Sequence, residues 1–294
     1  MTAGVSAADL QVHHRFEQVG DVKVFYREAG PRDAPIVLLL HGYAASSFMY
    51  RNLIPLLADG YRVIAPDLPG FGFTEAPARG QYDYTFDQLA KTIGQFTRQL
   101  GLDRYAMQVF DYGAPVGWRL AAEHPARISA IISQNGNAYE EGLGAGWAPI
   151  QKYWKNPSQA NRDALREFAT PASIRWQYLE GVPDQTLVAP DAIALESHLV
   201  SRPAMPTSSS TCCWTTPPTS RSIRSSRRTS ASTSRRCWPC GARTILFLPA
   251  GAEAWKRDIP GADVRFYDTG HLALETHGAE IGAVIRRFLD KNAK

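Results

Sequence analysis

Residues 105–115 read YAMQVFDYGAP, a short apolar run that ends in an acidic residue and a glycine turn. Apolar runs of this length without polar alternation are typical of strands covered on both faces, and such strands form parallel sheets. A residue directly after such a strand lies at the carboxyl end of the sheet, where open α/β folds bind their ligands. The stretch therefore predicts a buried strand over 105–110, followed by a candidate functional residue, Asp111.

Similar runs on both sides of this stretch extend the pattern. They predict further strands over residues 22–27, 36–40, 62–65, 128–133 and 263–267. Apolar residues between Phe86 and Leu100 recur at three- and four-residue spacing, which indicates an amphipathic helix, and Gly101 ends it. Strands that alternate with helices predict an α/β fold with a mostly parallel, doubly wound sheet.

Unusual turns follow several of these strands. His41-Gly42-Tyr43 follows 36–40, and a turn that ends in Gly270-His271 follows 263–267. Between residues 135 and 203 the strand pattern gives way to aromatic-rich helical sequence, which predicts an inserted helical cap. Its candidates for lining a substrate pocket are Trp147, Tyr153, Trp154, Trp176 and Tyr178.

The order of these motifs resembles the α/β-hydrolase superfamily, and within it the haloalkane dehalogenase and epoxide hydrolase branch with an aspartate nucleophile. The resemblance covers about residues 20–203 and 247–290, and its most specific motif is the turn Val109 to Gly113, which places Asp111 where that superfamily has its nucleophile. It implies an α/β-hydrolase fold. The expected division is a core over 1–134, a helical cap over 135–203, an anomalous segment over 204–246 and the rest of the core over 247–294.

The resemblance implies a hydrolase that uses no cofactor and no metal and acts on a small organic molecule with water. An aspartate is ordinarily ionised at neutral pH, so it can displace a leaving group from saturated carbon without a base. His271 would then activate water against the resulting alkyl ester. Backbone N–H groups of Tyr43 and Tyr112 would form the oxyanion hole. The alternative for Asp111 is a structural one, a cap for the helix that begins near Ala114.

Two substrate classes and one inactive state stay open. Val109 favours haloalkane dehalogenases, since epoxide hydrolases favour Gly at this position, but Tyr112 stands where dehalogenases usually have a halide-binding Trp. Epoxide opening would need cap hydroxyls, for which Tyr139, Tyr153 and Tyr178 are candidates. The third possibility is a catalytically impaired binding protein that keeps the pocket.

The acid of the catalytic triad is the missing member. In the family it follows the penultimate strand, or in some members the strand that ends near Ser133, and it orients the histidine. The penultimate strand is expected inside 204–246, where the sequence has no acid, and residues 134–137 read QNGN. Glu140 and Glu141 are weak candidates.

Composition sets the segment 204–246 apart. Residues 204–244 contain seven Arg, ten Ser, eight Thr and all four Cys, but no Asp, Glu or Lys, and the rest of the chain has 25 basic and 28 acidic residues. Cys237 and Cys240 form a C-x-x-C, but Cys212 and Cys213 are adjacent, which is not a usual zinc spacing. We interpret the segment as a frame-shifted translation, with the frame restored near Phe247. In that case this chain should lack both a core strand and the triad acid.

Overall composition limits the other classes. In 294 residues, 44% are hydrophobic and 20% charged, which is typical of a globular protein. The positive charge lies in the anomalous segment, so a nucleic-acid partner is not expected. The longest aliphatic run, 36–40, is too short to span a membrane, and the N-terminus lacks the layout of a secretion signal. These features predict a cytoplasmic protein without a membrane partner.

Overall fold

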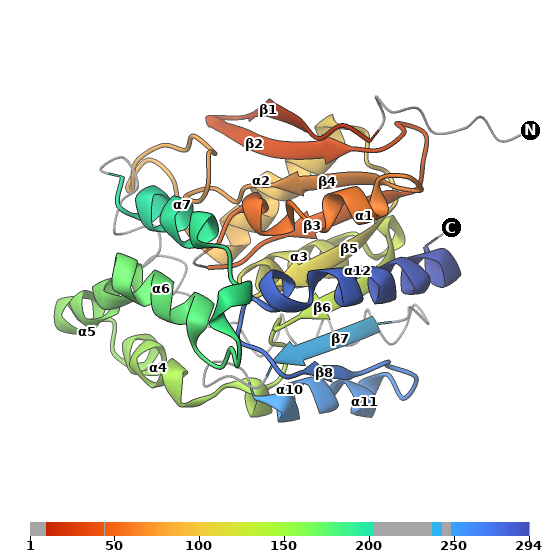
Figure 1. Cartoon of the computed structure of the whole chain (residues 1–294). Coiled ribbons are helices and arrows are strands. Elements are labelled where there is room, and N and C mark those ends of the chain that lie inside the picture. The colour runs from red at the N-terminus through yellow and green to blue at the C-terminus, as the bar shows by residue number, and fades with distance from the viewer. Residues whose placement is uncertain (1–9, 44, 203–236, 243–247, 294) are drawn as a thin grey trace, which may run out of the picture.

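One sheet of eight strands runs through the described residues, which are 10–43, 45–202, 237–242 and 248–293 of this computed structural model (Figure 1). The strands are β1 His13–Val19, β2 Val22–Ala29, β3 Ile36–Leu40, β4 Arg62–Pro66, β5 Tyr105–Phe110, β6 Ile128–Gln134, β7 Cys237–Ala242 and β8 Arg265–Tyr267. Their order is β1-β2-β4-β3-β5-β6-β7-β8. The β1–β2 and β2–β4 pairs are antiparallel, and all pairs from β4 to β8 are parallel. The predicted mostly parallel sheet is confirmed.

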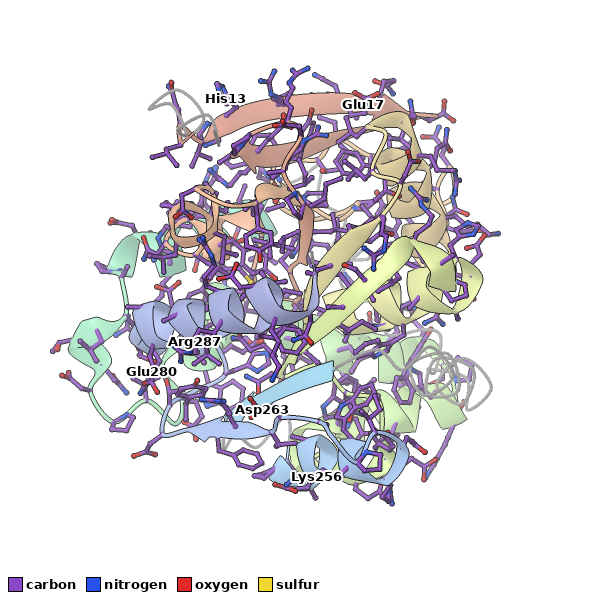
Figure 2. The ribbon with its side chains drawn as sticks, turned by 90° about the vertical axis from the view of Figure 1, so that its right-hand side faces the viewer. His13, Glu17, Lys256, Asp263, Glu280 and Arg287 are labelled. Carbon is purple, nitrogen blue, oxygen red and sulfur yellow. The ribbon has the colours of Figure 1, made fainter. Side chains whose placement is uncertain are left out.

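Helices cover both faces of this sheet. They are α1 Ile54–Leu57, α2 Phe86–Gln99, α3 Gly113–Glu123, α10 Pro249–Glu253, α11 Trp255–Asp258 and α12 Ala273–Asn292. In the turned view of Figure 2, Glu280 and Arg287 mark α12 on one side of the strands, and the yellow-toned helices α2 and α3 lie on the other. Because both faces are covered, every residue of β5 is buried. None of the described helices is long and apolar enough to cross a membrane.

The predicted elements lie close to the observed ones. Strands β3 and β5 have the predicted bounds, and α2 ends one residue before the predicted Leu100. The Thr85 hydroxyl begins α2 because it accepts a hydrogen bond from the Gln88 N–H group. Strand β1 was not predicted, since this edge strand is largely exposed and its sequence, HHRFEQV, carries few apolar residues.

Four more helices follow β6 within residues 135–202, the part of the chain before β7 that the structure describes. They are α4 Ala148–Lys155, α5 Gln159–Ala164, α6 Pro171–Leu179 and α7 Pro190–Val200. All four fall inside the range expected for the cap. In Figure 1 they lie on the side of the sheet toward which the arrowhead of β7 points, which is the carboxyl end of the parallel strands. These four helices therefore lie at the edge of the sheet where the sequence predicts the functional residues.

Strand β7 corrects one expectation about the anomalous segment, most of which lies outside the described residues. The backbone of Cys237–Ala242 pairs in parallel with β6 on one side and with β8 on the other. The expectation that this chain lacks a core strand here is therefore wrong. Backbone pairing needs only N–H and C=O groups, and Pro239, which lacks an N–H, removes one donor from the ladder.

Candidate active site

Asp111 occupies a sharp turn between β5 and α3. Its backbone has a φ of 46°, the left-handed region that non-glycine residues seldom adopt, and its side chain is buried. Helix α3 begins two residues later at Gly113, where a Cβ atom would collide with the backbone oxygen of Leu40. A residue without a side chain therefore lets α3 begin directly against β3, and this fixes the turn.

The two carboxylate oxygens of Asp111 have different surroundings. Oδ1 accepts hydrogen bonds from the backbone N of Tyr43 at 2.8 Å and from the backbone N of Tyr112 at 2.6 Å. Oδ2 lies 3.5 Å from Nε2 of His271. The structure thus brings together four residues singled out in the sequence. Helix α3 has no side-chain cap, so the geometry does not match the capping alternative for Asp111.

Gly42 explains how the loop after β3 can approach Asp111 so closely. A Cβ atom at this position would lie 2.8 Å from Asp111 Oδ1 and equally close to the backbone oxygen of Phe110. Such distances are shorter than ordinary van der Waals contact, so a side chain here would push the loop away from the carboxylate. The close approach is what carries the Tyr43 N–H group to Oδ1.

His271 lies in the loop between β8 and α12 and is 2% exposed. The ring of Phe110 packs against its imidazole, with the ring centroids 4.7 Å apart. The side-chain Nδ2 of Asn135, the residue after β6, donates a hydrogen bond of 2.7 Å to the backbone oxygen of His271. Neither contact was predicted from the sequence, although Asn135 was noted as a residue directly after a strand.

Buried polar groups hold the loops after β3 and β4 together. His41 Nε2 accepts a hydrogen bond from the Leu68 backbone N, and burial lowers the pKa of this imidazole below its ordinary value, so it is neutral. Asp67 accepts hydrogen bonds from the backbone N of Ser47 and from that of Phe73. These contacts fix the shape of the two loops.

Aromatic side chains surround the turn. The ring of Tyr112 has its centroid 5.4 Å from that of Tyr43, 6.0 Å from that of Phe71 and 5.1 Å from that of Phe86. Tyr43 and Tyr112 are both buried. Tyr112, at the position where dehalogenases usually have a Trp, is therefore packed within an aromatic cluster beside Asp111.

The aromatic candidates between residues 139 and 178 differ in their contacts and burial. The rings of Trp147 and Trp154 pair with each other at 6.0 Å, and the hydroxyl of buried Tyr153 accepts a hydrogen bond from Arg162. Tyr178 of α6 is buried, and this burial raises the pKa of its hydroxyl well above the ordinary value. Trp176, also on α6, is half-buried. Tyr139, a further hydroxyl candidate, donates to Asp258 of α11.

The weak candidates for the triad acid lie on the surface. Glu140 is exposed, and Glu141 is exposed and forms an ion pair of 2.6 Å with Arg257. An orienting acid must lie buried behind the imidazole, and the exposed positions of Glu140 and Glu141 do not fit this role. Within the described ranges, no group of three or more His, Cys, Asp or Glu side chains is placed to hold a metal ion.

Comparison with known proteins places the fold in a family. The family model described as "alpha/beta hydrolase fold" matches residues 35–278. An uncharacterized hydrolase of Saccharomyces cerevisiae is 41% identical over 290 residues, which are 95% of this chain and 97% of that protein. A haloalkane dehalogenase of Psychrobacter cryohalolentis is 42% identical over 116 residues, or 39% of this chain and 38% of that enzyme.

A solved structure has the same fold at low identity. A candidate epoxide hydrolase from Pseudomonas aeruginosa superposes with a TM-score of 0.75 at 19% identity, covering 95% of this chain and 96% of that one. This likeness supports the fold alone, whereas the family match and the long alignment with the yeast hydrolase cover most of the chain. The chain therefore belongs to the α/β-hydrolase fold family, as a hydrolase related to the haloalkane dehalogenases.

Proposed function

We propose that the protein cleaves a small halogenated compound by forming an ester at Asp111 and hydrolysing it with water activated by His271. One observation carries this proposal, the unequal surroundings of the two Asp111 oxygens. Oδ1 is held by two backbone N–H groups, and Oδ2 faces the imidazole of His271. The arrangement suits a carboxylate that attacks with Oδ2 while Oδ1 stays bound to donors that can later stabilise an oxyanion.

In the first step, Oδ2 attacks the carbon that carries the halogen. The new bond joins Oδ2 to this carbon, and the bond to the halogen breaks, so the halide leaves with the electron pair. No base is needed, because an ionised carboxylate is already a nucleophile. The two hydrogen bonds to Oδ1 fix the carboxylate and direct its other oxygen outward, and proximity supplies much of the rate.

In the second step, His271 takes a proton from water, and the water oxygen attacks Cγ of the ester. Negative charge then collects on Oδ1, where the N–H groups of Tyr43 and Tyr112 already point. Donors arranged before the reaction stabilise such an oxyanion without further reorganisation. When the bond from Cγ to Oδ2 breaks, the leaving alkoxide takes the proton from the His271 imidazolium and departs as an alcohol. The new carboxyl group of Asp111 loses its proton to water, which regenerates the carboxylate.

Two facts favour a halide over an epoxide as the leaving group. Val109 lies two residues before Asp111, as in the dehalogenase branch, and one relative aligned over part of the chain is a haloalkane dehalogenase.

The aromatic cluster of Tyr43, Phe71 and Tyr112 provides apolar surface next to the carboxylate. Such surface suits an uncharged organic substrate better than a polar one.

A single turnover in water enriched in heavy oxygen tests this chemistry. With the protein in excess over a haloalkane, we expect release of halide, an alcohol with ordinary oxygen, and one heavy oxygen on the peptide that carries Asp111. The alcohol oxygen comes from the carboxylate, so only the protein acquires the label in the first cycle. Direct attack of water on the substrate would instead label the alcohol and contradict the proposal. Diol formation from a matched epoxide, without halide release from haloalkanes, would assign the alternative substrate class.

Asn135 provides a test of how His271 is held. We expect Asn135→Gly to slow breakdown of the ester by about three- to tenfold, because one hydrogen bond to the His271 backbone is lost. Glycine is the suitable replacement, since Asn135 has a φ of 46° that other side chains tolerate poorly. The measurement is the rate of ester decay after rapid mixing, which separates this step from ester formation.

The control for this variant is Asn137→Gly. The Asn137 side chain accepts from the backbone N of Tyr139 and so holds the same loop without touching His271. An equal loss in both variants would show that Asn135 serves the loop in general.

A further inference from the structure

Glu196 is a buried carboxyl group on the cap that the proposed reaction does not use. It lies on α7, a helix with the sequence PDAIALESHLV, and it is 5% exposed. Its Oε1 accepts a hydrogen bond of 2.6 Å from the Ser46 hydroxyl, which belongs to the loop after β3. This contact joins residues 150 positions apart in the chain and links the cap directly to the core.

The surroundings of Glu196 disfavour its ionised form. Burial is the largest cause and Asp67 adds a like charge, and together they raise the pKa of Glu196 to about 8, although the hydrogen bonds from Ser46 and the charge of Arg27 oppose this. Tyr178 of α6 also faces this charge, and burial raises the pKa of its hydroxyl well above the ordinary value. In the folded protein at neutral pH, Glu196 therefore carries a proton.

The loop that Glu196 contacts is the loop that builds the site. Ser46 follows Tyr43 by three positions, and its hydroxyl also accepts from the Phe48 N–H group at the start of the short helix η1, Ser47–Tyr50. Just beyond α7, Arg202 donates to the backbone oxygen of Gly72, in the loop after β4. The end of the cap is thus attached to the two loops that hold the Tyr43 N–H group in place.

We propose that Glu196 is a positioning residue that fastens α7 to the loop of Tyr43, and that release of α7 is coupled to loss of the Glu196 proton. Its effect on catalysis rests on the proposed function, because it acts through the Tyr43 N–H group on Oδ1 of Asp111. The fastening itself is independent of that function. When α7 lifts away, the carboxyl group reaches water and ionises as an ordinary glutamate does.

The sign of the pH effect follows from linkage. A carboxyl group with a folded-state pKa above its open-state value holds its proton more tightly when α7 is docked. Docking is therefore favoured at low pH, weakens as pH rises from about 4.5 to about 8, and changes no further above that. Burial lowers the pKa of the neighbouring His41 and raises that of Tyr178. The Glu196→Gln variant keeps both groups, so a comparison with it isolates the contribution of Glu196.

Hydrogen exchange of the α7 backbone amides, corrected for the intrinsic effect of pH, measures this docking without any substrate. In the unaltered protein we expect protection of α7 to fall by up to about tenfold per pH unit between pH 5 and 8 and then to level off. In Glu196→Gln, which keeps an acceptor for Ser46 but cannot ionise, protection should stay constant over this range. The matched control is Asp191→Asn, an exposed acid on the same helix, which should behave as the unaltered protein does.

A second readout separates positioning from a purely structural role. The rate at which a haloalkane alkylates Asp111, measured as adduct mass, should decline over the same pH range in the unaltered protein and not in Glu196→Gln. Flat α7 protection in the unaltered protein would overturn the inference, even if the variant failed to fold. If α7 protection depends on pH but the rate of Asp111 alkylation does not, the positioning role is overturned. If α7 protection depends on pH but no adduct forms at any pH, the result counts against the proposed function and leaves the contact between α7 and the Tyr43 loop in place.

Discussion

In a His271→Ala variant exposed to a haloalkane, the peptide that carries Asp111 will gain the mass of the substrate's alkyl group and retain it. Ester formation needs only the ionised carboxylate, whereas ester hydrolysis needs a base for water. Loss of a general base slows such a step by about a hundred- to ten-thousandfold, so the ester accumulates. The experiment needs no turnover and therefore does not depend on the triad acid. Mass spectrometry of the digested protein gives both the modified residue and the group attached.

The control for this experiment is the double variant Asp111→Asn with His271→Ala. An amide at position 111 can still accept hydrogen bonds from Tyr43 and Tyr112, but it is a far weaker nucleophile than a carboxylate. No mass gain is expected. An adduct on another residue would refute Asp111 as the nucleophile. Absence of any adduct across haloalkanes and epoxides would favour a binding protein that has kept the fold without the reaction.

The second large effect concerns residues 204–246. We expect turnover to rise by about ten-thousandfold when this segment is replaced by the translation of the shifted reading frame that rejoins the chain near Phe247. The resemblance to the family places an acid after the penultimate strand, and loss of the acid that orients a catalytic histidine costs about this factor. Strand β7, Cys237–Ala242, lies in this segment, and such an acid would follow its carboxyl end.

Resequencing the gene across both borders of the segment comes first. A confirmed, uninterrupted frame would refute the interpretation at once. If the frame shift is real, product formation by the restored chain is compared with that of the same chain in which the new acid is replaced by its amide. A restored chain that turns over no faster than the present one would show that the missing acid does not limit the rate.

The middle of the fold could be predicted from the sequence almost to the residue. Strands β3 and β5 lie between other strands and under helices, so every position along them favours an apolar side chain and their bounds are sharp. The approach of Asp111 and His271 could be predicted for a similar reason, since parallel strands bring their carboxyl ends to one edge. Strand β1 could not, because one exposed edge leaves its composition close to that of a loop.

Sequence patterns could not predict the contacts that depend on how the cap packs against the core. Glu196 could be noticed as one acid in an apolar stretch, but no local rule connects it with Ser46. The contact of Asn135 with the His271 backbone likewise depends on two loops from different strands meeting in space. Local preferences along the chain carry no information about such pairs, which arise only when packing places separate elements against each other.

The left-handed backbone at Asp111 limits which amino acids can take its place during evolution. At a φ of 46° every residue except glycine is strained, and a side chain branched at Cβ crowds the backbone more than the unbranched side chains of serine, cysteine and asparagine do. A lineage could therefore exchange its carboxylate for a hydroxyl or a thiol by one substitution and keep the same turn. Threonine has a comparable hydroxyl, but its branched Cβ makes it a poor replacement at this backbone conformation.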